Sequence, residues 1–279
     1  MIKTLLSIAL AGTVLAAPAL AQDTLDRIKS SGQMTVATEA AFKPFEYVED
    51  GKIIGFGSDL LEELRQDLGG VEIEQLDLPF QGILAGLAAG QYDLVATSVA
   101  PNPDRAQSYA FSRPFASIEN VVVVPSDNDS ISELEDLNGL LVGTQLGSST
   151  EAVAREMNEQ LQAQGGSGFE DLRLYQTFPD TAFALRSGQV DVIVIGSTTA
   201  GEFMNASPDT FKVALSYGDP VYLTWVTRPE DKALLEVVNA MITRLVESGE
   251  LAEMQKKWIG VTSESPESGY LPDGAIQLQ

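Results

Sequence analysis

Short runs of apolar residues recur along the chain, and in several intervening segments apolar residues return at helical spacing. The runs predict buried strands at residues 34–37, 94–96, 121–124, 140–142, 192–195 and 221–226. Two apolar stripes predict helices, one made of Leu60, Leu61, Leu64 and Leu68 and the other of Leu234, Val238, Met241 and Leu245. Gly249 is well placed to end the second helix. Alternating strands and helices predict an α/β fold whose mostly parallel sheets are covered on both faces.

Part of this pattern occurs twice. Phe80 begins a predicted helix that ends at residues 90–93 (GQYD) and runs into an apolar strand. Phe178 begins a second such helix, which ends at residues 188–191 (GQVD) and also runs into a strand. Both features of the second copy follow those of the first at an offset of 98 residues. The repetition predicts two similar α/β lobes of about a hundred residues each.

Polar residues stand at the ends of the predicted strands. They are Thr38-Glu39, Thr97-Ser98, Thr144-Gln145 and Gly196-Ser197. Ligands of parallel α/β sheets bind outside the carboxyl ends of the strands. We therefore predict a binding cleft between the two lobes.

The composition excludes several functional classes. The 279 residues include no Cys and no His, so the chain has no disulfide scaffold, no imidazole-ligated metal and no Ser-His-Asp or Cys-His nucleophile. We expect neither a metal site nor a cofactor. The 40 acidic and 17 basic residues give a net charge of −23, which opposes binding to nucleic acid and to anionic membranes. With 44% hydrophobic residues, the chain can still bury a sizeable core.

Residues 1–21 have the pattern of a secretory signal peptide. Lys3 supplies a positive charge, residues 5–15 are apolar, and Ala19-Leu20-Ala21 is a small-x-small cleavage site. We expect cleavage after Ala21 and a soluble periplasmic protein. Because the chain has no Cys, attachment to a lipid through a lipoprotein cysteine is excluded.

Several short motifs in a fixed order resemble those of a known family. They are residues 25–29 (LDRIK), 42–46 (FKPFE), 55–56 (GF), 59–60 (DL), 90–93 (GQYD), 103–105 (PDR), 111–112 (FS), 143–149 (GTQLGSS), 188–191 (GQVD) and 257–260 (KWIG). Their order and spacing resemble the periplasmic solute-binding proteins of ABC importers for polar amino acids, of the family 3 type. The resemblance covers nearly all of the chain after the signal peptide.

The resemblance implies the type II fold of periplasmic binding proteins, with a two-strand hinge between two lobes. Residues 22–117 and 217–279 would form lobe 1, and residues 118–216 would form lobe 2, so that the last strand returns to lobe 1. It also implies a function. We expect a monomer that closes on a small solute and delivers it to an ABC permease in the inner membrane.

Nine residues are candidates for binding the solute: Glu39, Phe42, Phe80, Thr97, Ser98, Arg105, Gln145, Ser148 and Ser149. Arg105 matches the arginine that grips the ligand carboxylate in the family, and a guanidinium can donate two parallel hydrogen bonds to a carboxylate. Thr97 and Ser98 match positions that supply hydroxyl and backbone donors.

The aromatic and serine candidates each have an alternative role. Phe42 and Phe80 match rings that sandwich the apolar part of the ligand, or they belong to the core, as we expect for Phe45 and Phe56. Residues 147–150 (GSST) precede a predicted helix at 151–161, and free backbone N–H groups at a helix start suit an anion. The alternative for the hydroxyls there is helix capping by Ser149 or Thr150.

The chain departs from the family at three places. Gly196 stands where an Asp usually binds the ligand's α-ammonium, Gly57 replaces a further Asp, and Ala100 replaces a hydroxyl residue. An unpaired buried charge costs several kcal/mol, so a ligand cation would need another partner. Glu39 is the best available acid, unless it is a solvated carboxylate in a turn.

We therefore expect the ligand to be a small zwitterion, an amino acid or an amino-acid derivative. The set formed by Glu39, Phe42, Phe80 and Arg105 is similar to sites for ectoine-like or betaine-like solutes, which are the first alternative. A second is an enzyme similar to cyclohexadienyl dehydratases. Gly196 leaves one place for its general acid empty, and we expect no catalytic residue. A third is a sensory domain that passes its closure to a receptor.

Overall fold

The structure, a computed structural model, describes residues 23–276, so the predicted signal peptide lies outside the described residues. Its main sheet contains β1 (Gln33–Thr38), β5 (Glu72–Asp77), β6 (Leu94–Val99), β7 (Ala110–Phe111), β8 (Ala116–Pro125), β9 (Leu141–Gln145), β10 (Asp171–Tyr175), β11 (Val192–Gly196) and β12 (Phe211–Thr227). The strand order is β10-β9-β11-β8-β12-β6-β1-β5, and β7 pairs with β12 beside this path. A small second sheet contains β2 (Ala41–Phe42), β3 (Glu46–Glu49) and β4 (Lys52–Ile54).

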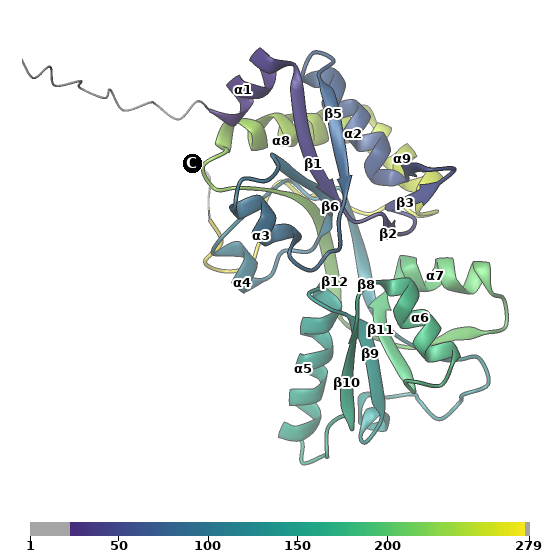
Figure 1. Ribbon diagram of the computed structural model, residues 1–279. Helices are drawn as coiled ribbons and strands as arrows, with labels where there is room; N and C mark the ends of the chain where they lie inside the picture. Colours follow the sequence, from purple (N-terminus) through teal and green to yellow (C-terminus); the bar gives the residue numbers. More distant parts are fainter. Residues whose placement is uncertain (1–22, 277–279) are drawn as a thin grey trace, which may run out of the picture.

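Helices cover this sheet in two groups (Figure 1). The helices are α1 (Thr24–Ser31), α2 (Phe56–Asp67), α3 (Ile83–Ala88), α4 (Pro103–Ala106), α5 (Ser149–Ala163), α6 (Phe178–Arg186), α7 (Ser197–Ala206), α8 (Lys232–Ser248) and α9 (Glu250–Trp258), with a 3-10 turn at Leu134–Leu137. One group surrounds β1, β5 and β6, and α5, α6 and α7 surround the strands β9, β10 and β11. Of the helices in residues 23–276, none is long and apolar enough to cross a membrane.

The strand pairing gives the predicted α/β class. β1 is parallel to β5 and β6, and β9 is parallel to β10 and β11. β8 and β12 run antiparallel to their neighbours. These two strands pass between the groups of helices (Figure 1), and we call them the crossover strands.

The crossover strands depart from regular pairing at several points, one of them near Gly218. β12 pairs with β8 as far as Leu223 and then with β6 at Thr224 and Val226, so the last strand passes from one lobe to the other, as expected. The pairing of β12 with β8 shifts register between Tyr217 and Val221, where Gly218 takes a φ of 70°. The predicted lobe boundaries at 117/118 and 216/217 lie near this irregularity and stay a prediction.

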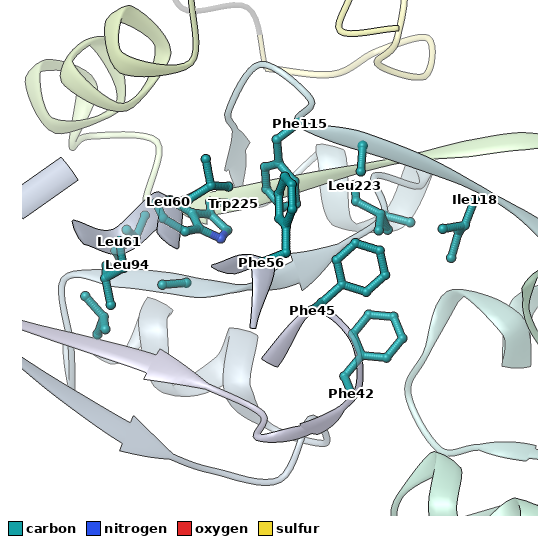
Figure 2. Close-up of a cluster of buried hydrophobic side chains, with 14 of the residues drawn as sticks. Phe42, Phe45, Phe56, Leu60, Leu61, Leu94, Phe115, Ile118, Leu223 and Trp225 are labelled. Atoms are coloured by element: carbon teal, nitrogen blue, oxygen red, sulfur yellow. The ribbon is translucent and has the colours of Figure 1, made fainter. Parts of the chain in front are cut away.

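Aromatic rings fill the core beside the crossover strands (Figure 2). Phe45, Phe56, Phe115 and Trp225 are fully buried, and the ring centroids of Phe56 and Phe115 lie 5.5 Å apart. The core role expected for Phe45 and Phe56 is therefore confirmed. The two predicted apolar stripes face the core from α2 and α8, and Gly249 ends α8 with a φ of 83°.

Some elements differ from the prediction. The sequence pattern does not predict β5 and β10, which lie at the two edges of the main sheet and carry charged residues. Edge strands are half exposed, so they lack a continuous apolar run. Phe80 does not begin a helix, because Gly82 takes a left-handed φ of 88° and α3 starts after it. Phe178 does begin α6.

Candidate functional site

The strand ends of both lobes line one pocket, with a cavity volume of about 20 Å³. Its lining contains Glu39, Phe42, Phe80, Ser98, Ala100, Arg105, Ile118, Gln145, Ser148, Ser149, Thr150, Phe178, Gly196 and Leu223. The structure thus brings together all the predicted binding residues except Thr97. Glu39 follows β1, Gln145 ends β9 and Gly196 ends β11, because the carboxyl ends of parallel strands meet at one edge of a sheet.

Arg105 lies in the single turn α4, which is capped by Asn102. The Nη1 atom donates to the Ala100 carbonyl at 2.8 Å, and Nη2 donates across the cleft to the Gly147 carbonyl at 2.6 Å. The guanidinium also stacks over the ring of Phe80, 5.5 Å from its centroid. Burial lowers the pKa of Arg105 to about 10, so the group is a cation at neutral pH. Within residues 23–276 it forms no ion pair.

Glu39 directly follows the carboxyl end of β1 in lobe 1, and it is only 3% exposed. Its carboxylate accepts a hydrogen bond from the side-chain amide of Gln145, which reaches it from β9. Burial raises the pKa of Glu39 from its ordinary value to about 7, and the nearby Asp77 adds to the shift while the Gln145 bond opposes it. The alternative of a solvated turn carboxylate is wrong, because Glu39 is buried and bonded to Gln145.

Glu46 is a buried acid beside the pocket, bonded to Ser98 of its lining, that the sequence reasoning missed. The fully buried carboxyl accepts hydrogen bonds from Thr97 Oγ1 at 3.2 Å, Ser98 Oγ at 3.3 Å and Ser98 N at 3.4 Å. Burial raises its pKa to about 8. A Cβ atom at Gly57 would lie 2.3 Å from the Glu46 carboxyl oxygen, so this glycine makes room for the acid.

The contacts of Glu46 change the roles of two predicted residues. Thr97 is fully buried, does not line the pocket and directs its hydroxyl to Glu46. Ser98 lines the pocket, but its hydroxyl and N–H also bond to Glu46. The only sequence signal for this arrangement is the glycine at position 57, where the resemblance leads one to expect an Asp.

Apolar side chains form the remaining walls. Phe178 of α6 lies with its ring centroid 5.3 Å from that of Phe42. Figure 2 shows Phe42, Ile118 and Leu223 along the edge of the aromatic core. The sequence reasoning missed Ile118, Phe178 and Leu223 as pocket residues. The 98-residue offset between Phe80 and Phe178 was a usable signal for Phe178, since Phe80 was already a candidate.

Gly196 faces an apolar side chain. A Cβ atom at Gly196 would lie 2.7 Å from Cδ1 of Ile118. The resemblance leads one to expect an ammonium-binding Asp at this position, and Ile118 instead fills the adjoining space. Among the residues that line the pocket, the buried acid is Glu39.

The start of α5 closes the lobe-2 side of the pocket. Ser148 caps the helix, because its Oγ accepts from the Glu151 N–H at 3.2 Å and donates to the Gln145 carbonyl at 2.7 Å. The alternative of capping by Ser149 or Thr150 is wrong, since both already lie inside the helix. Ser149 is the first helical residue, whose backbone N–H has no partner within the helix.

Known proteins are similar in sequence to most of this chain. A probable histidine-binding protein of Campylobacter jejuni is 28% identical over 228 residues, which are 81% of this chain and 84% of the relative. An arginine-binding extracellular protein of Bacillus subtilis is also 28% identical over 228 residues, or 81% of this chain and 86% of the relative. Both names describe amino-acid-binding proteins.

Solved structures agree with these relatives. A mutant of ArgBP from T. maritima superposes with a TM-score of 0.75 at 29% identity, covering 85% of this chain and 99% of that one. An ancestral amino acid-binding protein, described as a precursor of cyclohexadienyl dehydratase, gives a TM-score of 0.75 at 28% identity with the same coverage.

The family assignment follows from most of the chain. The model of the bacterial extracellular solute-binding proteins, family 3, matches residues 34–261. This span contains the whole pocket and both crossover strands. The chain therefore belongs to the bacterial extracellular solute-binding proteins, family 3, and it binds a small solute in the periplasm or outside the cell.

Proposed function

We propose that the protein is the solute-binding component of an ABC importer, which captures a small zwitterion by hinge closure and delivers it to a membrane permease. One observation carries the proposal. The pocket holds a guanidinium on Arg105 and a carboxylic acid on Glu39, and their protein partners are carbonyl and amide groups. A zwitterion supplies the counter-charge that each group lacks.

The other pocket residues fit the same ligand. Arg105 would hold the solute carboxylate, helped by the free N–H groups at the start of α5. Glu39 would hold the cation, with Gln145 orienting its carboxylate. Phe42 and Phe178 would pack against the apolar part of the solute, and aromatic faces also attract cations.

The type of cation separates two candidate solute classes. The curated relatives are named for amino acids such as histidine, arginine and cystine. The contact of Ile118 at Gly196 favours the alternative class, because an apolar wall suits the alkylated or delocalised cation of a betaine-like or ectoine-like solute better than a primary ammonium. Amino acids and their derivatives remain the proposed class, and betaine-like solutes the alternative.

We propose binding without catalysis, in a monomer. A dehydratase needs a general acid facing the substrate, and the position of Gly196 offers none. Incubation with prephenate or arogenate decides this point, and turnover of either compound would overturn the proposal. The signal peptide with cleavage after Ala21, the periplasmic location, the monomeric state and the permease partner all belong to the proposal.

A thermal-shift panel tests the solute class. The panel contains L-arginine, L-histidine, L-glutamine, glycine betaine and ectoine, with agmatine as a matched control that lacks only the carboxylate of arginine. A solute present at about 100 times its Kd stabilises the folded protein by roughly 2.7 kcal/mol, which raises Tm by several degrees. We expect stabilisation by at least one zwitterion and none by agmatine. An unchanged Tm with every zwitterion of the panel would contradict the proposal.

A further inference from the structure

The chain continues beyond the family match. The match ends at residue 261, and the structure describes the chain up to residue 276. Residues 262–276, which we call the C-terminal strap, contain no helix or strand and lie along lobe 1 (Figure 1). Their contacts run from α9 to α4, the turn that carries Arg105.

The first anchor of the strap is Ser263. Its backbone N–H donates to the side chain of Gln255 in α9 at 2.9 Å, and the Gln255 amide donates back to its carbonyl at 3.2 Å. Its hydroxyl accepts from the backbone N–H of Ser117 at 3.0 Å. Ser117 lies in β8, so the strap begins at the base of a crossover strand.

The second anchor is Arg113, which is only 8% exposed. Its Nε atom donates to the Ser265 carbonyl at 3.0 Å, and Nη1 lies 3.3 Å from the Glu267 carboxylate. The Ser265 hydroxyl donates to the Pro114 carbonyl. A buried guanidinium needs such partners, so this part of the strap also contributes to stability.

The third anchor reaches the other crossover strand. The ring of Tyr270 lies edge-on to that of Tyr222 in β12, with centroids 6.4 Å apart. Tyr222 is the register partner of Ser117. The strap therefore holds both crossover strands at one level, on the lobe-1 side of the irregularity near Gly218.

The strap ends on α4. The backbone N–H of Ile276 donates to the carbonyl of Ala106 at 3.0 Å. Ala275 is buried in the same apolar cluster as Ala106 and Phe111. Ala106 directly follows Arg105, so the end of the strap holds the residue next to the proposed carboxylate anchor.

We propose that the C-terminal strap is a positioning element that holds α4 against lobe 1 and so fixes Arg105 for the solute. A helical turn of four residues is not stable on its own, because forming the first turn costs more entropy than its hydrogen bonds return. The strap supplies the missing packing and a hydrogen bond from outside the turn. The inference rests on the proposed function, since it assigns Arg105 to solute binding.

Two variants disturb only the end of the strap, one by deleting it and the other by removing its hydrogen bond to Ala106. A stop codon in place of Pro272 deletes residues 272–279 and keeps the anchors at Ser263, Arg113 and Tyr270. Ile276→Pro removes the N–H that bonds to Ala106, and Ile276→Ala is its matched control, since it keeps that N–H. None of these changes alters a residue that lines the pocket.

Hydrogen exchange of the solute-free protein gives the first readout. We expect the amides of residues 105–109 to exchange at least ~10-fold faster in the truncated protein and in Ile276→Pro, because opening of α4 exposes them. Ile276→Ala should exchange as the wild type does, and so should α5 in all variants. Unchanged exchange of residues 105–109 in both variants would overturn the proposal.

Calorimetry with L-arginine and glycine betaine gives the second readout. For the probe that the wild type binds, we expect the truncation to raise Kd at least ~5-fold while Tm of the solute-free protein moves by less than about 2 °C. In an Arg105→Lys background the truncation should have little further effect, and in a Phe178→Leu background its effect should persist. Faster exchange with an unchanged Kd would show that the strap does not position Arg105. If the wild type binds neither probe, that result counts against the proposed solute class. The hydrogen-exchange experiment still decides whether the strap holds α4.

Discussion

At the scale of single residues, the pocket depends on charges whose protein partners are neutral. Arg105 bonds to two backbone carbonyls and Glu39 to an amide. Such partners replace part of the lost hydration but leave the net charge uncompensated. A solute with matching charges therefore gains more from these two residues than a neutral solute does.

Replacing Arg105 should remove most of the affinity. A hydrogen bond to a charged group contributes roughly 1.5–3 kcal/mol, so we expect Arg105→Ala to raise Kd by roughly 10- to 150-fold in calorimetry. Arg155→Ala is the matched control, because Arg155 is exposed and pairs with Glu151 on α5. If Arg105→Ala binds the solute about as tightly as the wild type does, Arg105 does not hold the solute carboxylate.

The affinity for a cationic solute should depend on the charge of Glu39. Since its pKa is about 7 in the folded protein, the carboxylate is partly protonated at neutral pH. Kd for glycine betaine, whose cation does not titrate, should fall as pH rises from 5.5 to 8.5, and Glu39→Gln should bind weakly at every pH. A pH-independent Kd in the wild type would show that Glu39 does not hold the cation.

Glu46 should make the solute-free protein less stable at alkaline pH. Its pKa is raised above the ordinary value, so folding takes up a proton between the two values and stability falls as pH rises from about 4.5 to about 8. Glu46→Gln should flatten this profile and gain at least ~1 kcal/mol at pH 8.5, since one pKa unit corresponds to about 1.4 kcal/mol. Thermal or urea unfolding from pH 5 to 8.5 measures this, with exposed Glu62→Gln as the control. An unchanged slope in Glu46→Gln would mean that Glu46 stays ionised.

At the scale of elements, an ion pair joins the loop after β2 to helix α7 across the cleft. Lys43 follows β2, and its ammonium lies 3.1 Å from the Glu202 carboxylate on α7. The hydrogen bond to Glu202 raises the pKa of Lys43. The pair thus joins the two lobes outside the pocket, where the side chain of Lys43 remains 54% exposed.

This exposed pair should contribute little to closure. Surface ion pairs contribute about 0–1 kcal/mol and weaken in salt. We expect Glu202→Gln to raise the solute Kd by less than ~5-fold at low salt, with no difference from the wild type in about 1 M NaCl. Glu119→Gln, an exposed change on β8, is the control. A larger loss that persists in high salt would show that the pair is a specific latch.

At the scale of the whole molecule, the crossover strands are the only strands of residues 23–276 that pair across the two halves of the main sheet. Of the two register shifts in their ladder, the one near Gly218 lies close to the predicted lobe boundaries, and a bulged strand bends at such a point. Motion at this point would open and close the pocket by rotating one lobe against the other.

Solute binding should therefore make the molecule more compact. Small-angle scattering should show a smaller radius of gyration with a saturating zwitterion than without it, because the solute bridges residues from both lobes. Arg105→Ala at the same solute concentration is the control and should stay extended. Identical scattering curves with and without a bound solute would contradict hinge closure.

The sequence by itself determined the class of fold, the family resemblance and most of the pocket. Strands and helices follow local periodicity, and polar residues at strand ends must meet at one edge of a parallel sheet, which is why Glu39, Gln145 and Gly196 were found. Arg105 was found through a short motif. None of these inferences needs knowledge of which distant side chains touch.

Only the tertiary structure decided which group fills each space. The Glu46 carboxylate accepts hydrogen bonds from the hydroxyls of Thr97 and Ser98, which lie 51 and 52 positions further along the chain. Ile118 fills the space beside Gly196. The strap meets α4 across 170 positions, where it bonds to Ala106. Contacts at such separations depend on the packing of the whole core, which leaves no periodic trace in the local sequence.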